Sequence, residues 1–73
     1  MMEELARYRC VGDDGTELVV LDRRHVHVTR GDQGARRQLG ARRLSLISGA
    51  AVRYIDATTF ELVETGEILR RIN

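Results

Sequence analysis

Apolar and polar side chains alternate along most of this chain, and the clearest alternation lies in residues 52–72. Phe60 and Leu62 fall on one face of an extended strand, and the residues on either side of them fall on the other. A short polar stretch follows, in which Gly66 is able to adopt the positive φ that a tight turn often needs. The alternation then resumes, so the segment is predicted to form a β-hairpin.

A second hairpin is indicated near the start of the chain. Residues 6–11 alternate in the same way and lead to the Asp-Gly dipeptide at 14–15, one of the strongest short hairpin signals. Residues 16–21 supply the partner strand, in which Leu18 and Val20 continue one apolar face. Because the opposite face of this strand is apolar too, we expect both of its faces to be covered.

A third strand is predicted after a turn at residues 22–24. Residues 25–29 alternate cleanly, with valines on one face and His25 and His27 on the other. Residues 31–34 are polar and bounded by glycine, which indicates a loop.

The segment of residues 35–43 admits several interpretations. A helix is compatible with its apolar spacing, but Gly40 would interrupt that helix at a cost of about 1 kcal/mol relative to alanine. Residues 44–47 fit a strand better than a helix. We therefore favour a strand from about Arg42, and we keep helix, strand and loop as alternatives before it.

These elements together predict an all-β fold. Parallel strands would need crossovers for which the chain has no room, so we expect a small antiparallel meander of six or seven short strands. A flat sheet would expose its edges, and we expect it to curl into an SH3-like barrel or a two-layer sandwich. Residues 1–5 carry no strand pattern and are expected to fray or to form a short helical turn at the N-terminus. Residues 1–73 form one small all-β domain with a thin core.

The cysteine content and the lack of long apolar runs indicate the compartment in which the protein works. Cys10 is the only cysteine, so no internal disulfide forms, and its alternation with Tyr8 is typical of a small core residue rather than of a nucleophile. The sequence shows neither a signal-peptide core nor a run long enough to cross a membrane. These features predict a soluble, cytoplasmic protein without a membrane partner.

Charge is distributed unevenly along the chain. Residues 1–22 carry a net charge of −4, residues 23–43 carry +6, and residues 44–73 carry −1. All 12 basic residues are arginine. The middle of the chain is therefore strongly basic, although the whole chain has a net charge of only +1.

The arginine-rich segment of residues 23–43 is the main candidate for a binding site. Guanidinium groups form bidentate contacts with phosphate or carboxylate, so either phosphate or an acidic partner suits it. A nucleic-acid site usually adds stacking aromatic side chains, and Tyr8, Tyr54 and Phe60 are all predicted to face the core. The alternative to a binding site is a solvent-exposed face whose charge is partly neutralised by the acidic first segment of this copy or of a neighbouring one. The candidate residues are Arg23, Arg24, Arg30, Arg36, Arg37, Arg42 and Arg43.

Metal binding and catalysis find little support. His25 and His27 would project from one face of a strand, but two ligands are too few for a zinc site. The carboxylates lie at predicted turns or exposed strand positions, where they normally serve turn formation and solubility. No phosphate-binding loop or nucleophile elbow occurs. We predict a non-enzymatic protein with no cofactor and no metal.

The leading hypothesis is a binding or assembly module that self-associates or binds a protein partner. A small domain without disulfides often gains stability through oligomer formation. Nucleic-acid binding through residues 23–43 is the alternative. The candidate interface residues are the apolar side chains predicted to face outward, namely Val19, Leu21, Val63 and Leu69.

Overall fold

The computed structural model describes residues 1–73 as one antiparallel sheet of six strands and contains no helix. The strands are β1 (Met2–Val11), β2 (Glu17–Gly31), β3 (Gly34–Leu46), β4 (Val52–Asp56), β5 (Thr59–Leu62) and β6 (Ile68–Arg71). No helix is therefore present that could cross a bilayer. The all-β prediction is confirmed, with the lower of the two expected strand numbers.

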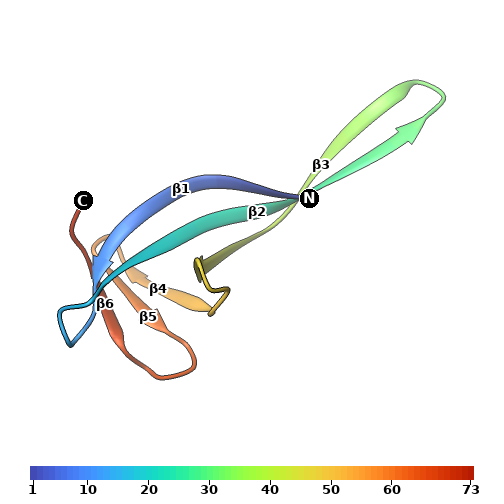
Figure 1. Cartoon of the computed structure of the whole chain (residues 1–73). Coiled ribbons are helices and arrows are strands. Elements are labelled where there is room, and N and C mark those ends of the chain that lie inside the picture. Colours follow the sequence, from blue (N-terminus) through green and yellow to red (C-terminus); the bar gives the residue numbers. More distant parts are fainter.

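The sheet curls into a half-barrel in which neighbours along the chain are neighbours in space (Figure 1). The strand order is β3-β2-β1-β6-β5-β4, so β1 pairs with both β2 and β6. The two edge strands meet at a single bridge between Ser45 and Ala51. The turn between them is closed by the Leu46 N–H, which donates to the Ala50 carbonyl at 2.9 Å. Since all six strands belong to one sheet, a two-layer sandwich does not form.

The core fills one end of the concave face. It consists of Cys10, Val20, Val52, Phe60 and Leu69, and partly buried leucines pack around it. These residues come from every strand except β3, because alternation along each strand sends every second side chain to the inside. Only nine of the 73 residues are buried, so the core is as thin as the chain length led us to expect.

The hairpin predicted at the end of the chain is confirmed as β5 and β6. The Gly66 N–H donates to the Leu62 carbonyl at 2.8 Å, and Gly66 has a φ of +75°, as the turn requires. The register pairs Phe60 with Leu69. Because paired residues of two strands share a face, Leu69 points into the core, with no exposed surface, and not outward as we predicted.

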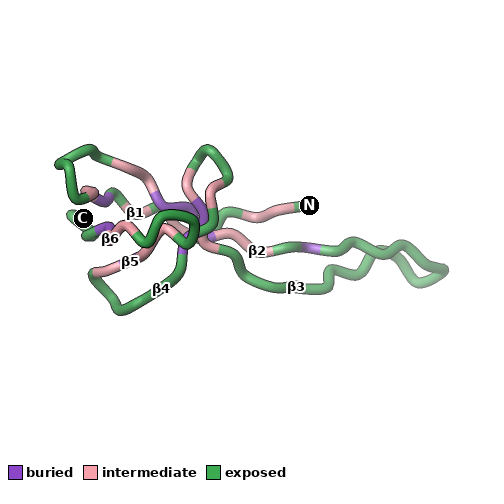
Figure 2. The backbone as a smooth tube through the Cα atoms, turned by 90° about the horizontal axis from the view of Figure 1, so that it is seen from below, coloured by how far each residue is buried: buried purple, intermediate pink, exposed green.

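A two-stranded arm projects from the half-barrel, formed by residues 26–39 at the far ends of β2 and β3 (Figures 1 and 2). Every residue from 27 to 43 is exposed. The radius of gyration is 15.2 Å, whereas a compact chain of this length has about 11 Å. The arm makes the molecule elongated, and the extents along its three principal axes are 54 × 24 × 20 Å.

Two local predictions in the first half of the chain are wrong. Residues 1–5 form no helical turn, because β1 begins at Met2 and its first residues pair with β2 at His25, Arg24 and Arg23. Residues 22–24 do not turn the chain, because β2 runs through them without a break. In both places the backbone groups find partners on a neighbouring strand, a source of stability that a local sequence pattern does not reveal.

The segment for which helix, strand and loop stayed open is a strand throughout. β3 begins at Gly34 and not near Arg42, and it contains a bulge in which Gly40 and the residue after it lie opposite His25. A Cβ atom at position 40 would lie 3.0 Å from the Cβ atom of His25. Gly40 therefore permits the close approach at the bulge, and bulges bend the strands that carry them. This bend lies where the arm leaves the half-barrel.

Candidate functional site

The candidate arginines divide into those with a partner inside the chain and those without. Arg24 and Arg37 both form ion pairs with Glu3 of β1, the former at 3.3 Å. Arg42 pairs with Asp22, which is only 3% exposed. The acidic first segment thus neutralises part of the basic middle within one copy of the chain.

The other four candidate arginines differ in what they contact. A terminal nitrogen of Arg23 donates to the Ser45 hydroxyl at 2.9 Å, and one of Arg43 donates to a backbone carbonyl at 3.2 Å. Arg30, like Arg36, forms neither an ion pair nor a side-chain hydrogen bond. These last two flank the turn at the tip of the arm, where their charges are free for a partner.

The two faces of the arm have different chemistry. The register pairs Val26 with Leu39 and Val28 with Arg37, so one face combines apolar side chains with arginine. The opposite face carries His27, Thr29 and other polar residues. Val26 is only 1% exposed, but Val28 is 49% exposed and Leu39 is 60% exposed, because no other element covers the ribbon beyond Val26.

Both edges of the arm are also open. β1 covers the outer edge of β2 only as far as Met1, whose carbonyl accepts a hydrogen bond from the Val26 N–H at 2.7 Å. β3 is the end strand of the sheet, and its outer edge has no partner until the bridge at Ser45. Unpaired strand edges are templates for another strand.

A second feature is a groove of about 620 Å³ at the end of the concave face that the core does not fill. Its floor includes Phe60, whose ring stacks on Tyr8 at 5.6 Å and meets the edge of Tyr54 at 6.3 Å. Tyr54 was predicted to lie in the core, but it is 59% exposed. The prediction is wrong because the half-barrel is open at this end, so an inward-pointing side chain reaches solvent.

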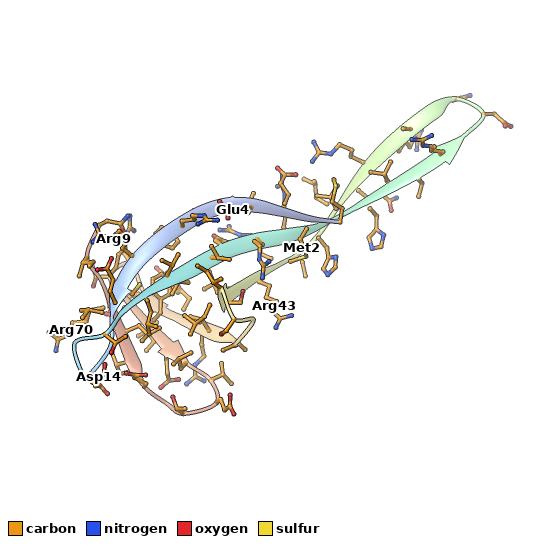
Figure 3. All side chains as sticks on the ribbon, viewed as in Figure 1. Met2, Glu4, Arg9, Asp14, Arg43 and Arg70 are labelled. Carbon is orange, nitrogen blue, oxygen red and sulfur yellow. The ribbon has the colours of Figure 1, made fainter.

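Arginines surround the aromatic floor of the groove. Arg42 and Arg43 of β3 line one side, and Arg71 of β6 lies over the Tyr8 ring at 4.5 Å from its centre. The hydrogen bond and the charge of Asp22 raise the pKa of Arg42. In Figure 3, Arg43 lies between the arm and the turn that carries Asp14.

The histidines and the cysteine occupy positions that agree with their patterns. The rings of His25 and His27 lie on one exposed face, stacked at 6.3 Å. No group of three or more side chains of the metal-binding types is gathered in the structure. Cys10 has no exposed surface, and burial raises the pKa of its thiol, which keeps it protonated at neutral pH.

The four candidate interface residues do not share one environment. Leu69 belongs to the core and Leu21 is 6% exposed, so neither side chain is accessible to a partner. Val19 is half-buried and Val63 is 58% exposed. Val63 is therefore the most accessible of the four, and further accessible apolar side chains occur at Val28 and Leu39 on the arm, which the sequence analysis did not select.

The sequence analysis also missed the groove. Tyr54 and Arg71 lie far apart along the chain, and alternation along single strands does not say which end of the inner face is filled. Comparison with known proteins finds no matching family model, no similar curated protein and no similar solved structure.

Proposed function

We propose that this protein is a non-enzymatic assembly module that forms a dimer through the arm of residues 26–39. The observation that supports this most strongly is that no element covers the arm beyond Val26, so residues 27–39 are all exposed. A two-stranded ribbon alone in water is marginally stable. Contact with a second copy would cover its apolar face and its open edges, and would add the buried surface that the thin core lacks.

Charge complementarity supports a second copy as the partner. The tip of the arm carries Arg30 and Arg36. The opposite end of the molecule carries two acidic turns, residues 12–16 between β1 and β2 and residues 63–67 between β5 and β6. The Asp13 N–H donates to a Glu67 carboxylate oxygen at 3.1 Å, which holds these turns together. In a twofold dimer each arm would lie along the half-barrel of the other copy, with its basic tip near the acidic turns. We propose in addition that the protein is cytoplasmic and that its half-barrel is of the SH3-like type.

Light scattering over a range of protein concentrations tests the proposal. We expect a dimer whose dissociation constant rises with salt, because opposite charges meet in it. Replacing Val28 and Leu39 together by aspartate is expected to raise the dissociation constant by at least about tenfold, equivalent to about 1.4 kcal/mol. Ile55→Asp is the matched control, since Ile55 is an exposed apolar residue of β4. A folded monomer at every concentration would refute the proposal.

Nucleic-acid binding is the second candidate, and the unpaired arginines at the arm tip favour it. The major groove of DNA admits a two-stranded β-ribbon, and arginine contacts with phosphate would dominate the affinity. Fluorescence anisotropy with labelled single- and double-stranded oligonucleotides tests it. Arg30→Gln with Arg36→Gln is expected to weaken binding and to reduce the salt slope by about 2. Arg53→Gln on β4 is the control, and equal effects of control and test variants would count against an arm site.

A further inference from the structure

We infer that the groove at the open end of the half-barrel binds a small ligand in which a flat ring is joined to an anionic group. This site is separate from the arm, and its test does not depend on dimer formation. The groove volume of about 620 Å³ lies within the range of roughly 300–1,000 Å³ that is typical of small-molecule sites. The mouths of small β-barrels are among the places where such sites occur.

The aromatic side chains supply the surface for the flat ring. Phe60 is 3% exposed and is fixed by the core, and it holds Tyr54 in an edge-to-face arrangement with an interplanar angle of 72°. Tyr54 remains 59% exposed although the Phe60 contact restricts its ring. Such a ring offers apolar area at little cost in conformational entropy, because Tyr54 has few rotatable bonds to immobilise.

The charged side chains supply the site for the anionic group. Three guanidinium groups and one carboxylate line the groove, so its lining has a net charge of +2. Arg42 is held by the Asp22 carboxylate, and Arg71 is held by the carbonyls of Ala57 and Asn73 and by the Tyr8 ring. These contacts orient the guanidinium groups before any ligand arrives, which lowers the entropy cost of binding.

The guanidinium groups also keep hydrogen-bond donors for a ligand. Each guanidinium has five N–H donors. Arg42 uses Nε and one terminal nitrogen on Asp22, and Arg43 uses one terminal nitrogen on the Gly49 carbonyl. The donors that remain suit a carboxylate or a phosphate, which accept paired N–H groups. A ligand that lacks either the ring or the anion would satisfy only half of this lining.

The test adds five probes, one at a time, to the full chain. Two-dimensional NMR and isothermal titration calorimetry measure the binding of each probe. Adenosine monophosphate and phenylacetate both join a ring to an anion, and they distinguish a nucleotide from an aromatic carboxylate as the source of this chemistry. Adenosine, phenylacetamide and inorganic phosphate each lack one half. We expect saturable shifts at the amides of Tyr54, Phe60 and Arg71 with at least one ring-bearing anion, and binding of the corresponding incomplete probes that is weaker by about tenfold or more.

Variants in matched pairs locate the site. Tyr54→Ala is expected to weaken binding by roughly 5- to 100-fold, the usual loss for a stacking aromatic side chain, while Ile55→Ala leaves it unchanged. Arg71→Gln is expected to weaken binding about tenfold or more, the loss expected for a charged hydrogen-bond donor. Arg70→Gln, at the preceding position of β6, is expected to leave binding unchanged. Arg43→Gln replaces Arg71→Gln if the latter fails to fold.

Three results would overturn the inference. The first is no saturable binding of adenosine monophosphate or phenylacetate up to about 10 mM, a concentration at which a millimolar site would be largely filled. The second is equal affinity for the ring-bearing anions and for inorganic phosphate, which would indicate a nonspecific basic surface. The third is equal loss of affinity in Arg70→Gln and Arg71→Gln. None of these results bears on the dimer, and a monomeric protein that binds the probes would refute the proposed function alone.

Discussion

Leu69 and Val63 belong to the same hairpin and have similar hydrophobicity, yet their environments are opposite. Leu69 faces Phe60 across the ladder and has no exposed surface, whereas Val63 lies in the turn and is 58% exposed. The five residues between β5 and β6 set the register, and the register decides which side chains face inward.

Substitution by alanine is expected to separate these two residues. Leu69→Ala should lower the free energy of unfolding by about 2–5 kcal/mol, because it leaves a cavity in the core. Val63→Ala should change it by less than about 0.5 kcal/mol, as is usual at exposed positions. Urea unfolding followed by circular dichroism measures both values. Equal losses would contradict the burial of Leu69.

Two aspartates couple stability to pH. The Thr16 N–H donates to the Asp14 carboxylate at 2.9 Å and lowers its pKa, and the Thr58 N–H does the same for Asp56 at 2.9 Å. Because the folded pKa lies below the unfolded value of about 3.9, the folded state binds fewer protons. Their stabilising contribution is complete above that unfolded pKa and is lost as pH falls through the folded pKa.

The corresponding asparagine variants test this coupling. The doubly substituted protein Asp14→Asn with Asp56→Asn is expected to lose stability less steeply than the unmodified protein between about pH 4 and about pH 2. Asp32→Asn is the control, because the carboxylate of Asp32 accepts no hydrogen bond in the structure. Urea unfolding at each pH gives the slopes. Parallel pH profiles for the unmodified and doubly substituted proteins would show that the turn bonds do not matter.

Among the elements, β3 does most to shape the molecule. Its outer part belongs to the arm, its last residues contact the core, and its bulge at Gly40 lies between the two. The side chain of His25 leaves little space above position 40. Gly40, which in the sequence argued against a helix, is therefore the residue that allows two strands to approach at a bend.

Alanine at two glycines of the arm and its base tests the role of the bulge. Gly40→Ala is expected to lower the free energy of unfolding by about 1 kcal/mol, because the new Cβ atom must displace His25. Gly31→Ala is the control, since a Cβ atom there meets nothing within 4 Å and its φ is not positive. We expect Gly31→Ala to be neutral or slightly stabilising. Urea unfolding would contradict this account if both variants lost the same stability.

The whole molecule consists of a small half-barrel with a thin core and an arm with almost none. The basic tip of the arm and the acidic turns lie at opposite ends of an extent of 54 Å (Figure 1). This separation leaves Arg30 and Arg36 at the tip with no acidic partner inside the chain, and in the proposed dimer a second copy would supply one.

Hydrogen exchange at two protein concentrations is expected to reveal that association. Amides of residues 27–39 should exchange rapidly at low concentration, because the ribbon opens easily. They should become protected at high concentration together with the acidic turns, while the core strands change little. Mass spectrometry of short peptides resolves these regions. Exchange of the arm that does not depend on concentration would contradict a dimer formed through it.

The strands and the charge pattern were largely predictable, and the candidate sites were not. Residues 59–71 gave a correct hairpin because alternation and turn chemistry act over a few neighbouring residues. The arginines were identified as a group, but which of them lack an acidic partner depends on contacts such as Glu3 with Arg37, which lie far apart along the chain. Tyr54 was assigned to the inner face correctly and to the core wrongly.

Strand type, the turns other than the one wrongly predicted at residues 22–24, and the segregation of charge therefore follow from the sequence, because each depends on residues close together along the chain. The register of Leu69, the bulge at Gly40, the length of the arm and the open end of the half-barrel depend on which strands pair and where each pairing stops. β2 has 15 residues and β3 has 13, whereas β4, β5 and β6 have no more than five. The two long strands therefore extend beyond the end of the short ones, and their far ends form an arm that no other strand covers.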